Sequence, residues 1–151
     1  MRFIKLAIVS VLVLFLIVTG ISLLLPSHVR ISRAINIEAG PEKIQPYIAS
    51  LDQWKRWNAF LADSSMKLDI RLRSTKPDSV TTVWTQADGR SFHCSYSLMP
   101  SGDLTIVQCY FDFYLRWYPW EKFGSIIYDQ QMGPGMEKSL TRLKSLVESS
   151  H

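Results

Sequence analysis

Few residues in this sequence have both the type and the spacing that catalysis requires. Of three histidines, His28 adjoins a long apolar run, His151 ends the chain, and His93 falls on the polar side of an alternating segment. There is no Gly-x-Ser-x-Gly, no phosphate-binding glycine loop and no His-Glu-x-x-His. His93 and Cys94 cannot share a metal, because neighbours in a strand point in opposite directions. We therefore expect no catalytic residue, no metal and no cofactor.

The two cysteines, Cys94 and Cys109, have a spacing that could place them side by side. They lie in alternating segments, 91–98 and 105–113, on either side of a turn at 100–103. If the turn is centred on its second and third residues, Cys94 faces Cys109 and the apolar residues of both strands share one face. A disulfide bond is then possible and would persist outside the cytoplasm. The alternative is two buried thiols that act as small apolar side chains.

Arg33 interrupts the apolar face of an alternating segment, residues 29–38. It could reach the headgroup of a ligand, or it could pair with Glu137. An edge position in the sheet or a local bulge would also explain a charged residue there. The sequence leaves these explanations open.

The N-terminal part of the chain is expected to anchor it in a membrane. Residues 6–25 carry no charge and cover about 30 Å as a helix, the thickness of a bilayer's hydrocarbon core. The run is longer than the apolar region of a signal peptide, and no Ala-x-Ala-like site follows it. We expect an uncleaved anchor over residues 1–27 and one soluble domain over residues 28–151. A signal peptide cut near Gly20 is the alternative.

The charge distribution argues against nucleic acid as a partner. Two of the 17 basic side chains, Arg2 and Lys5, flank the apolar run, which leaves 15 against 13 acidic ones, so no basic excess remains for a nucleic-acid surface. Arg2 and Lys5 favour a cytoplasmic N-terminus, although Arg30 and Arg33 weaken that preference. We expect a single-pass membrane protein whose soluble domain is periplasmic or otherwise extracytoplasmic.

Hydrophobic periodicity predicts the elements that position these residues. The segment 29–38 alternates as a half-buried strand does. A helix should start at Pro41 and be kinked or shortened by Pro46, and a second, capped by Asp52, should carry Trp54 and Trp57 on one face. Alternation then predicts strands at 66–73, 80–85, 91–98 and 105–113. Helices are expected at 123–132 and 136–147, separated by an interruption at Gly133-Pro134-Gly135.

This order resembles the helix-grip superfamily, the SRPBCC group that includes START lipid-transfer domains, polyketide cyclases and dehydrases, and the major birch pollen allergen. The resemblance rests on the segments INIEAGPEKIQPYI, LDQWKRWN, SFHCSYSLMPSGDLTIVQC and GMEKSLTRLKSLVE. Subfamilies with one N-terminal membrane span look similar over the whole length. The resemblance implies an α+β fold: a curved antiparallel β-sheet wrapped around a long C-terminal α-helix, preceded by a single transmembrane helix.

The resemblance also implies an apolar cavity between the sheet and the helix. Trp54 and Trp57 would cap its mouth or, alternatively, form plain core. The same two explanations apply to the other candidates. The residues expected to line the cavity are Trp54, Trp57, Trp84, Tyr96, Phe111, Tyr128, Met132, Met136 and Leu140.

The function expected from this fold is the binding of a lipid or another hydrophobic small molecule, without catalysis. A polyketide cyclase or dehydratase is one alternative, and it would need a titratable pair inside the cavity. A protein-interaction module whose cavity is filled by its own side chains is another, although no protein partner can be named. The run Trp117-Tyr118-Pro119-Trp120 could be an aromatic patch at the membrane surface or a lid over the cavity.

Overall fold

The computed structural model describes residues 2–62 and 67–150. Met66, the expected start of a strand, and His151 therefore lie outside the described residues. The chain divides into two compact units. One contains residues 2–29 and 114–127, and the other contains residues 30–113 and 128–150, apart from the gap already given. The expected division into an anchor at 1–27 and a domain at 28–151 stays a prediction.

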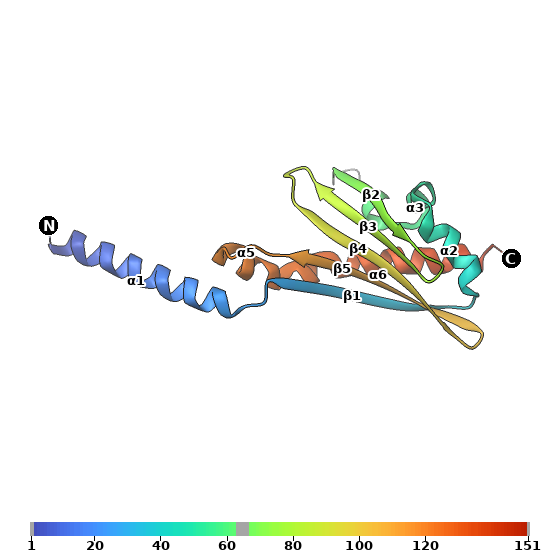
Figure 1. Ribbon diagram of the computed structural model, residues 1–151, viewed down its shortest axis with the longest axis horizontal. Coiled ribbons are helices and arrows are strands. Elements are labelled where there is room, and N and C mark those ends of the chain that lie inside the picture. Colours follow the sequence, from blue (N-terminus) through green and yellow to red (C-terminus); the bar gives the residue numbers. More distant parts are fainter. Residues whose placement is uncertain (1, 63–66, 151) are drawn as a thin grey trace. The chain divides into compact units, whose positions relative to one another are not determined.

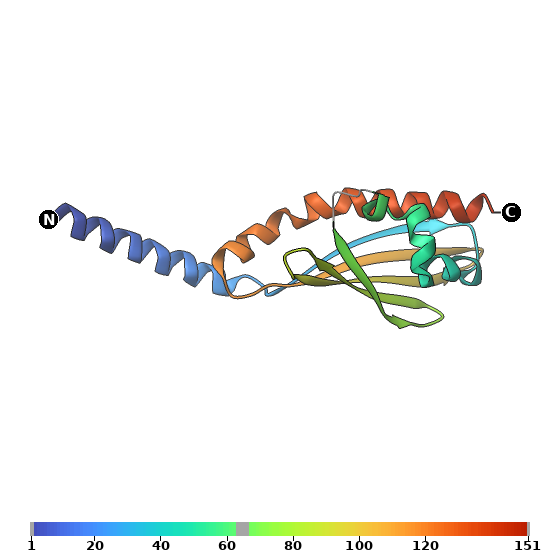
Figure 2. The same ribbon diagram turned by 90° about the horizontal axis from the view of Figure 1, so that it is seen from above.

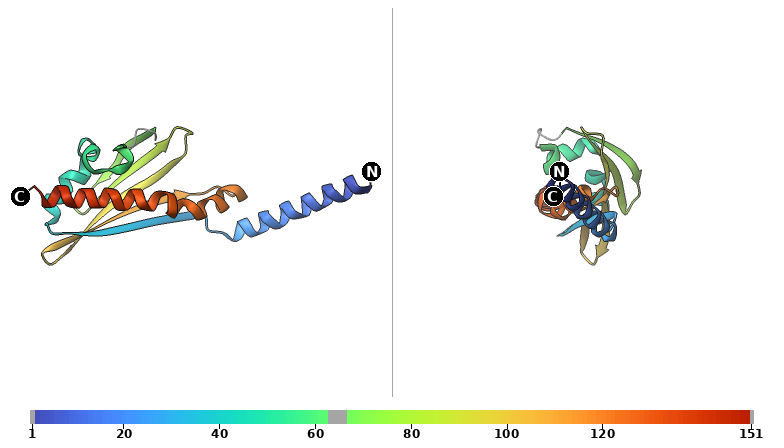
Figure 3. Two further views of the ribbon diagram at one scale, coloured as in Figure 1. Left: turned by 180° about the vertical axis from the view of Figure 1, so that it is seen from behind. Right: turned by 90° about the vertical axis from the view of Figure 1, so that its left-hand side faces the viewer.

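The sheet has five strands in the order β1-β5-β4-β3-β2 and is antiparallel, as expected (Figure 1). Viewed from one end, it is curved (Figure 3). Burial alternates along β3 and β5, so one face of these strands belongs to the core, which is the physical meaning of period two. The strands are β1 His28–Ile37, β2 Leu68–Thr75, β3 Ser79–Gln86, β4 Ser91–Ser101 and β5 Leu104–Tyr114.

The expected register of the β4–β5 hairpin is wrong by two residues. Ser101 pairs with Leu104, so Cys94 lies opposite Phe111, and Tyr96 opposite Cys109. The loop consists of Gly102 and Asp103, and Gly102 has a φ of 63°, which suits the first central position of a type II′ turn. A shift of two residues leaves every side chain on its expected face, because the side-chain period of a strand is also two.

Three short helices follow β1: α2 Pro41–Ala49, α3 Leu51–Trp57 and α4 Ala59–Ala62. Helix α2 begins at Pro41 as expected, and Pro46 lies within it without ending it. The expected cap of α3 is wrong: Ser50 is the N-cap residue, and Asp52 lies in the first turn. The structure adds α4, which the sequence did not predict and which packs on the C-terminal helix.

The C-terminal helix α6 Tyr128–Glu148 runs along one face of the sheet (Figures 2 and 3). Its buried face supplies much of the core. The expected interruption at Gly133-Pro134-Gly135 is wrong, because α6 continues through it. A Cβ atom on Gly133 would lie 2.5 Å from Arg33 Nη2, and one on Gly135 would lie 2.5 Å from Phe60 Cζ. Both glycines thus allow close approach. The buried apolar residues of α6 are Met132, Met136, Leu140, Leu143 and Val147.

Gly135→Ala should destabilise the protein by about 1 kcal/mol, even though alanine is the better helix former. The gain in helix propensity is about 1 kcal/mol, whereas overpacking against the Phe60 ring costs about 2 kcal/mol. Gly133→Ala is the matched control, because its Cβ would meet only the flexible end of Arg33. Urea unfolding of both variants measures the difference, and a stabilised Gly135→Ala protein would contradict the close packing of Phe60.

The other unit contains α1 Arg2–Leu24, α5 Pro119–Gly124 and a short 3₁₀ helix, η1 Ser125–Ile127. Residues 123–132 are helical as expected, but they do not form one helix: Phe123 belongs to α5, η1 follows, and α6 begins at Tyr128. Among the described residues, α1 is the one helix long and apolar enough to span a membrane. Its 23 residues cover about 35 Å. Nearly all its side chains are exposed, which suits either a membrane anchor or a signal sequence.

Candidate functional site

A layer of aromatic side chains lies on the inner face of the sheet. We call it the aromatic layer. It consists of six residues: Trp54 and Trp57 from α3, Phe60 from α4, Trp84 from β3, Tyr96 from β4 and Phe111 from β5. Each of these side chains is buried. Strand alternation brings Trp84, Tyr96 and Phe111 to this face, and the spacing of three residues brings both α3 tryptophans to one side of their helix.

The rings of the aromatic layer contact one another directly. The centroid of Trp54 lies 5.5 Å from that of Trp57, 5.4 Å from Tyr96 and 6.0 Å from Trp84. Trp84 in turn lies 5.3 Å from Phe111 and 5.6 Å from Phe60. These are ordinary distances for tilted and edge-to-face pairs. The rings therefore occupy much of the space in which the sequence predicted a cavity.

The indole N–H groups of the three buried tryptophans have partners within the protein. Trp54 Nε1 donates to the Ile48 carbonyl at 2.9 Å, and Trp57 Nε1 donates to the Tyr47 carbonyl at 3.2 Å. Trp84 Nε1 donates to Thr82 Oγ1 at 2.9 Å. Since a buried donor without a partner is costly, these bonds hold the rings in place without a ligand.

The row of rings continues from the aromatic layer to a less buried end. Phe92 stacks on Phe113 with 4.8 Å between centroids, and Phe113 lies 5.0 Å from Tyr128 of α6. Phe113 and Tyr128 are both half-buried, whereas Trp57 is fully buried. Exposure therefore rises along the row, from α3 toward the first turn of α6. We call the Phe113–Tyr128 end the open end.

Of the nine residues expected to line a cavity, all except Tyr128 are buried. Trp54 and Trp57 are packed within the core, as the alternative explanation required. Their role toward a ligand stays a prediction. One open surface hollow formed by described residues, of about 630 Å³, lies elsewhere and is bounded by Pro41, Glu42, Gln45, Thr75, Lys76 and Pro77.

The two cysteines lie diagonally across the β4–β5 pair, not directly opposite each other. Both are free and buried. Diagonal neighbours have Cα atoms about 7–8 Å apart, beyond the usual range for a disulfide, so a bond would require movement of the strands. The Cys94–Cys109 disulfide stays a prediction, and the sheet as it stands disfavours it.

Burial also suppresses the ionisation of these groups. It raises the pKa of the Cys94 thiol well above its usual value, and contact with Cys109 adds to the effect. Burial likewise raises the pKa of the Tyr96 hydroxyl, which lies beside both thiols. A thiolate is the reactive form of cysteine, so Cys94 is held as an unreactive thiol. These inward-facing groups offer no acid–base pair near neutral pH.

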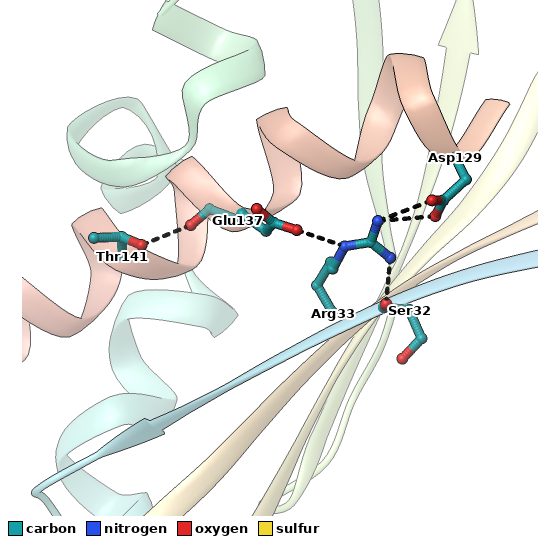
Figure 4. A network of polar contacts seen from close by, with 5 residues as sticks. All are labelled: Ser32, Arg33, Asp129, Glu137 and Thr141. Carbon is teal, nitrogen blue, oxygen red and sulfur yellow. Dashed lines mark hydrogen bonds and ion pairs between the residues drawn. The ribbon is translucent and has the colours of Figure 1, made fainter. Parts of the chain in front are cut away.

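Arg33 connects β1, an edge strand, to α6 (Figure 4). Its guanidinium donates to Glu137 Oε1 at 2.8 Å and to Asp129 Oδ2 at 3.0 Å. Of the explanations that the sequence left open, the structure shows both the edge position and the pair with Glu137. These bonds, with Asp129 first, raise the pKa of Arg33 above its usual value. The carboxylates are more than half exposed, so the contribution to stability is at most about 1 kcal/mol. Arg33 therefore fastens the helix to the sheet.

The outer face of the sheet is polar, and His93 lies on it as expected. His93 pairs with Asp112 across the strands. Strand alternation places Asp112 on this outer face and predicts that it is exposed to solvent. That prediction is wrong: Asp112 is 6% exposed, because Arg30 covers it with bonds of 2.6 and 3.0 Å. Arg30 also lies over the Tyr110 ring, 4.7 Å from its centroid. Within residues 2–62 and 67–150, no three His, Cys, Asp or Glu side chains gather as metal ligands do.

Sequence reasoning missed Asn58 and Phe60. Asn58 is fully buried; its Oδ1 accepts a bond from the Phe60 N–H at 3.0 Å, while its Nδ2 has no protein partner. Ala59, between them, donates its N–H to Ser139 of α6 at 2.9 Å. The spacing of three residues from Trp54 to Trp57 to Phe60 was the signal available for Phe60.

Comparisons with known proteins identify the fold. No family model and no curated protein matches the sequence. Among solved structures, SA2116 from Staphylococcus aureus, a protein of unknown function, is similar with a TM-score of 0.63 and 13% identity, over 82% of this chain and 95% of that one. MLL2253 from Mesorhizobium loti is similar with a TM-score of 0.60 and 11% identity, over 82% and 99%.

A third similar structure is DynU16, a protein of the dynemicin biosynthetic locus. It has a TM-score of 0.58 and 12% identity over 79% of this chain, which spans 47% of the length of DynU16. The fold is the helix-grip fold. At such low identity, the likeness shows the fold alone, and the function has to be argued from the residues.

Proposed function

We propose that this chain is a membrane-anchored helix-grip domain that binds a hydrophobic small molecule or lipid, without catalysing a reaction. The observation that carries this proposal is the continuous row of rings between the sheet and α6, which becomes half-buried at Phe113 and Tyr128. An apolar molecule that enters at the open end would leave water and contact ring faces, and the hydrophobic effect would drive its binding.

Asn58 supports a ligand with one polar group. Its Nδ2 is the one buried side-chain donor without a partner among the described residues of the sheet-containing unit. Its neighbour Phe60 lies 5.6 Å from both Trp84 and Phe111, so Asn58 borders the aromatic layer. A ligand oxygen or an ordered water could accept this hydrogen bond. The polar contact would orient the ligand, while the rings supply the affinity.

The anchor in this proposal is the apolar run at residues 6–25, nearly all of it within α1, in the manner of subfamilies with one N-terminal span. Its length and its exposed apolar side chains support a span. Arg2 and Lys5 favour a cytoplasmic N-terminus and a periplasmic or otherwise extracytoplasmic domain.

A protein-interaction module is the second candidate. The fully buried rings of Trp54, Trp57 and Trp84, with their N–H groups bonded within the protein, favour a core that has no room for a ligand. A cyclase or dehydratase has less support, because the inward-facing titratable groups Cys94 and Tyr96 stay protonated near neutral pH.

Native mass spectrometry of the full chain tests the first candidate against the second. The protein is assembled in nanodiscs of one synthetic phosphatidylcholine, so any other bound apolar compound must have come from the cell. We expect such a compound, and we expect Tyr128→Ala at the open end to lower its affinity about tenfold, the value of one buried ring face.

Tyr110→Ala is the matched control for this experiment. Tyr110 is also half-buried, but it lies on the outer face of the sheet beneath Arg30. Equal losses in both variants would contradict a site at the open end. A protein that carries only the nanodisc lipid would favour the interaction module.

A further inference from the structure

The segment from Tyr114 to Ile127 is fastened to the C-terminal end of α1. The Leu115 N–H donates to the Ser27 carbonyl at 2.7 Å, and Ser22 Oγ donates to the Trp117 carbonyl at 3.4 Å. Helix α5 packs on α1 within the same compact unit. The place of this segment is therefore fixed relative to the end of the candidate span, whatever the placement of the other unit.

Lys122 provides the central connection. It is only 4% exposed, and its Nζ donates to the Leu25 carbonyl at 2.7 Å and to Ser27 Oγ at 2.8 Å. The last carbonyls of a helix lack partners within the helix and carry a partial negative charge, so a cation there is favourable. Lys122 thus holds α5 at the point where α1 ends.

The same segment exposes large apolar and aromatic side chains, among them two tryptophans. Trp117 and Trp120 are 58% and 65% exposed, in contrast to the three buried tryptophans. The Tyr118 ring lies 4.9 Å from the centroids of both, and its plane is nearly parallel to that of Trp120. The exposed set, which we call the interfacial patch, is Tyr114, Trp117, Trp120, Phe123, Ile126 and Ile127.

We propose that the interfacial patch docks into the headgroup region of the bilayer that α1 enters. This inference rests on the anchoring part of the proposed function and is independent of ligand binding. Tryptophan and tyrosine favour the headgroup level, where a ring is buried and its N–H or O–H stays wet. The end of a span lies at that level, and the hydrogen bonds through Ser27 and Lys122 place the patch beside it.

The patch should bind zwitterionic lipid, since its segment has little net charge. Residues 114–127 contain two basic side chains, Arg116 and Lys122, and one acidic side chain, Glu121. Lys122 is buried and bonded to the end of α1, and Glu121 Oε2 accepts a bond from the backbone N–H of Arg116 at 2.8 Å, so Arg116 and Glu121 leave opposite charges close together in the segment. Anionic lipid is therefore not required for docking.

Tryptophan quenching in the full chain tests this proposal. The protein is reconstituted in phosphatidylcholine vesicles that carry bromine atoms near the top of the acyl chains. Trp54, Trp57 and Trp84 are fully buried and serve as an unquenched internal reference. We expect Trp117→Phe/Trp120→Phe to reduce the lipid-quenched fraction at least threefold, whereas Trp84→Phe should not lower it.

An alkaline carbonate wash separates the two ways in which the proposal can fail. Retention in the membrane, with Trp117 and Trp120 quenched by aqueous acrylamide instead of brominated lipid, would overturn docking and leave the anchor intact. Retention with both tryptophans shielded from both quenchers would point to a protein cover and would also overturn lipid docking. Release by the wash would overturn the anchor and the docking together.

Discussion

Trp54→Ala should lower the free energy of unfolding by about 4 kcal/mol, because it removes a fully buried ring from the centre of the aromatic layer. Trp54 contacts the rings of Trp57, Trp84 and Tyr96, and its N–H is bonded to the Ile48 carbonyl. Truncation of a buried tryptophan typically costs about 3–5 kcal/mol, since transfer free energy is lost and a cavity remains. Urea unfolding of the full chain in detergent micelles, followed by circular dichroism, measures the loss.

Trp120→Ala is the matched control for this variant. Its side chain is 65% exposed and lies in the interfacial patch, so we expect a change within about 0.5 kcal/mol in micelles. A loss below about 1 kcal/mol for Trp54→Ala would mean that the surroundings of Trp54 are loosely packed. That result would contradict the filled core and would favour a ligand cavity around α3.

Stability should fall at alkaline pH through Cys94 and Tyr96. Burial raises the pKa of both groups in the folded protein, whereas in the unfolded chain they ionise near about 8.5 and 10. Above those values the unfolded chain loses protons that the folded protein keeps, so the equilibrium shifts toward unfolding. At a pH below the pKa values of the unfolded chain, Cys94 and Tyr96 are protonated in both states and cause no loss of stability.

For each group, the slope can reach about 1.4 kcal/mol per pH unit over the range in which the unfolded chain has lost the proton and the folded protein still holds it. Urea unfolding across this range measures the slope. In the double variant Cys94→Ala/Tyr96→Phe, the decline should become much shallower. An unchanged slope in that variant would mean that other groups carry the pH dependence, and a flat profile in the parent protein would mean that the thiol and the hydroxyl reach water.

Hydrophobic patterning in the sequence was enough to predict the strands, the inward faces of β4 and β5, and the apolar stripe of α6. These features depend on local period, two for a strand and 3.6 for a helix, and the period survives small errors in the ends of elements. The hairpin illustrates this: its register was wrong by two residues, yet Cys94, Tyr96, Cys109 and Phe111 all lie on the predicted face. The prediction that Cys94 lies directly opposite Cys109 was wrong, because the residues that face each other depend on the exact position of the turn.

The continuity of α6 and the burial of Asp112 depend on residues that pack against them from distant parts of the chain, so only the tertiary structure decided these features. Gly133-Pro134-Gly135 predicts a break, but α6 continues through it, and Arg33 and Phe60 from distant parts of the chain closely approach its two glycines. Asp112 reads as exposed, but Arg30 covers it.

The candidate site was likewise visible in the sequence only as a set of residue types. The sequence alone predicted that Trp54, Trp57, Trp84, Tyr96 and Phe111 face inward, but it missed Phe60. The packing of Trp54, Trp57 and Trp84 into contact, and the half-buried position of Tyr128, follow from three-dimensional distances between α3, the strands and α6. Spacing along a chain sets the direction of a side chain, but the volume left between facing elements depends on how all of them pack together.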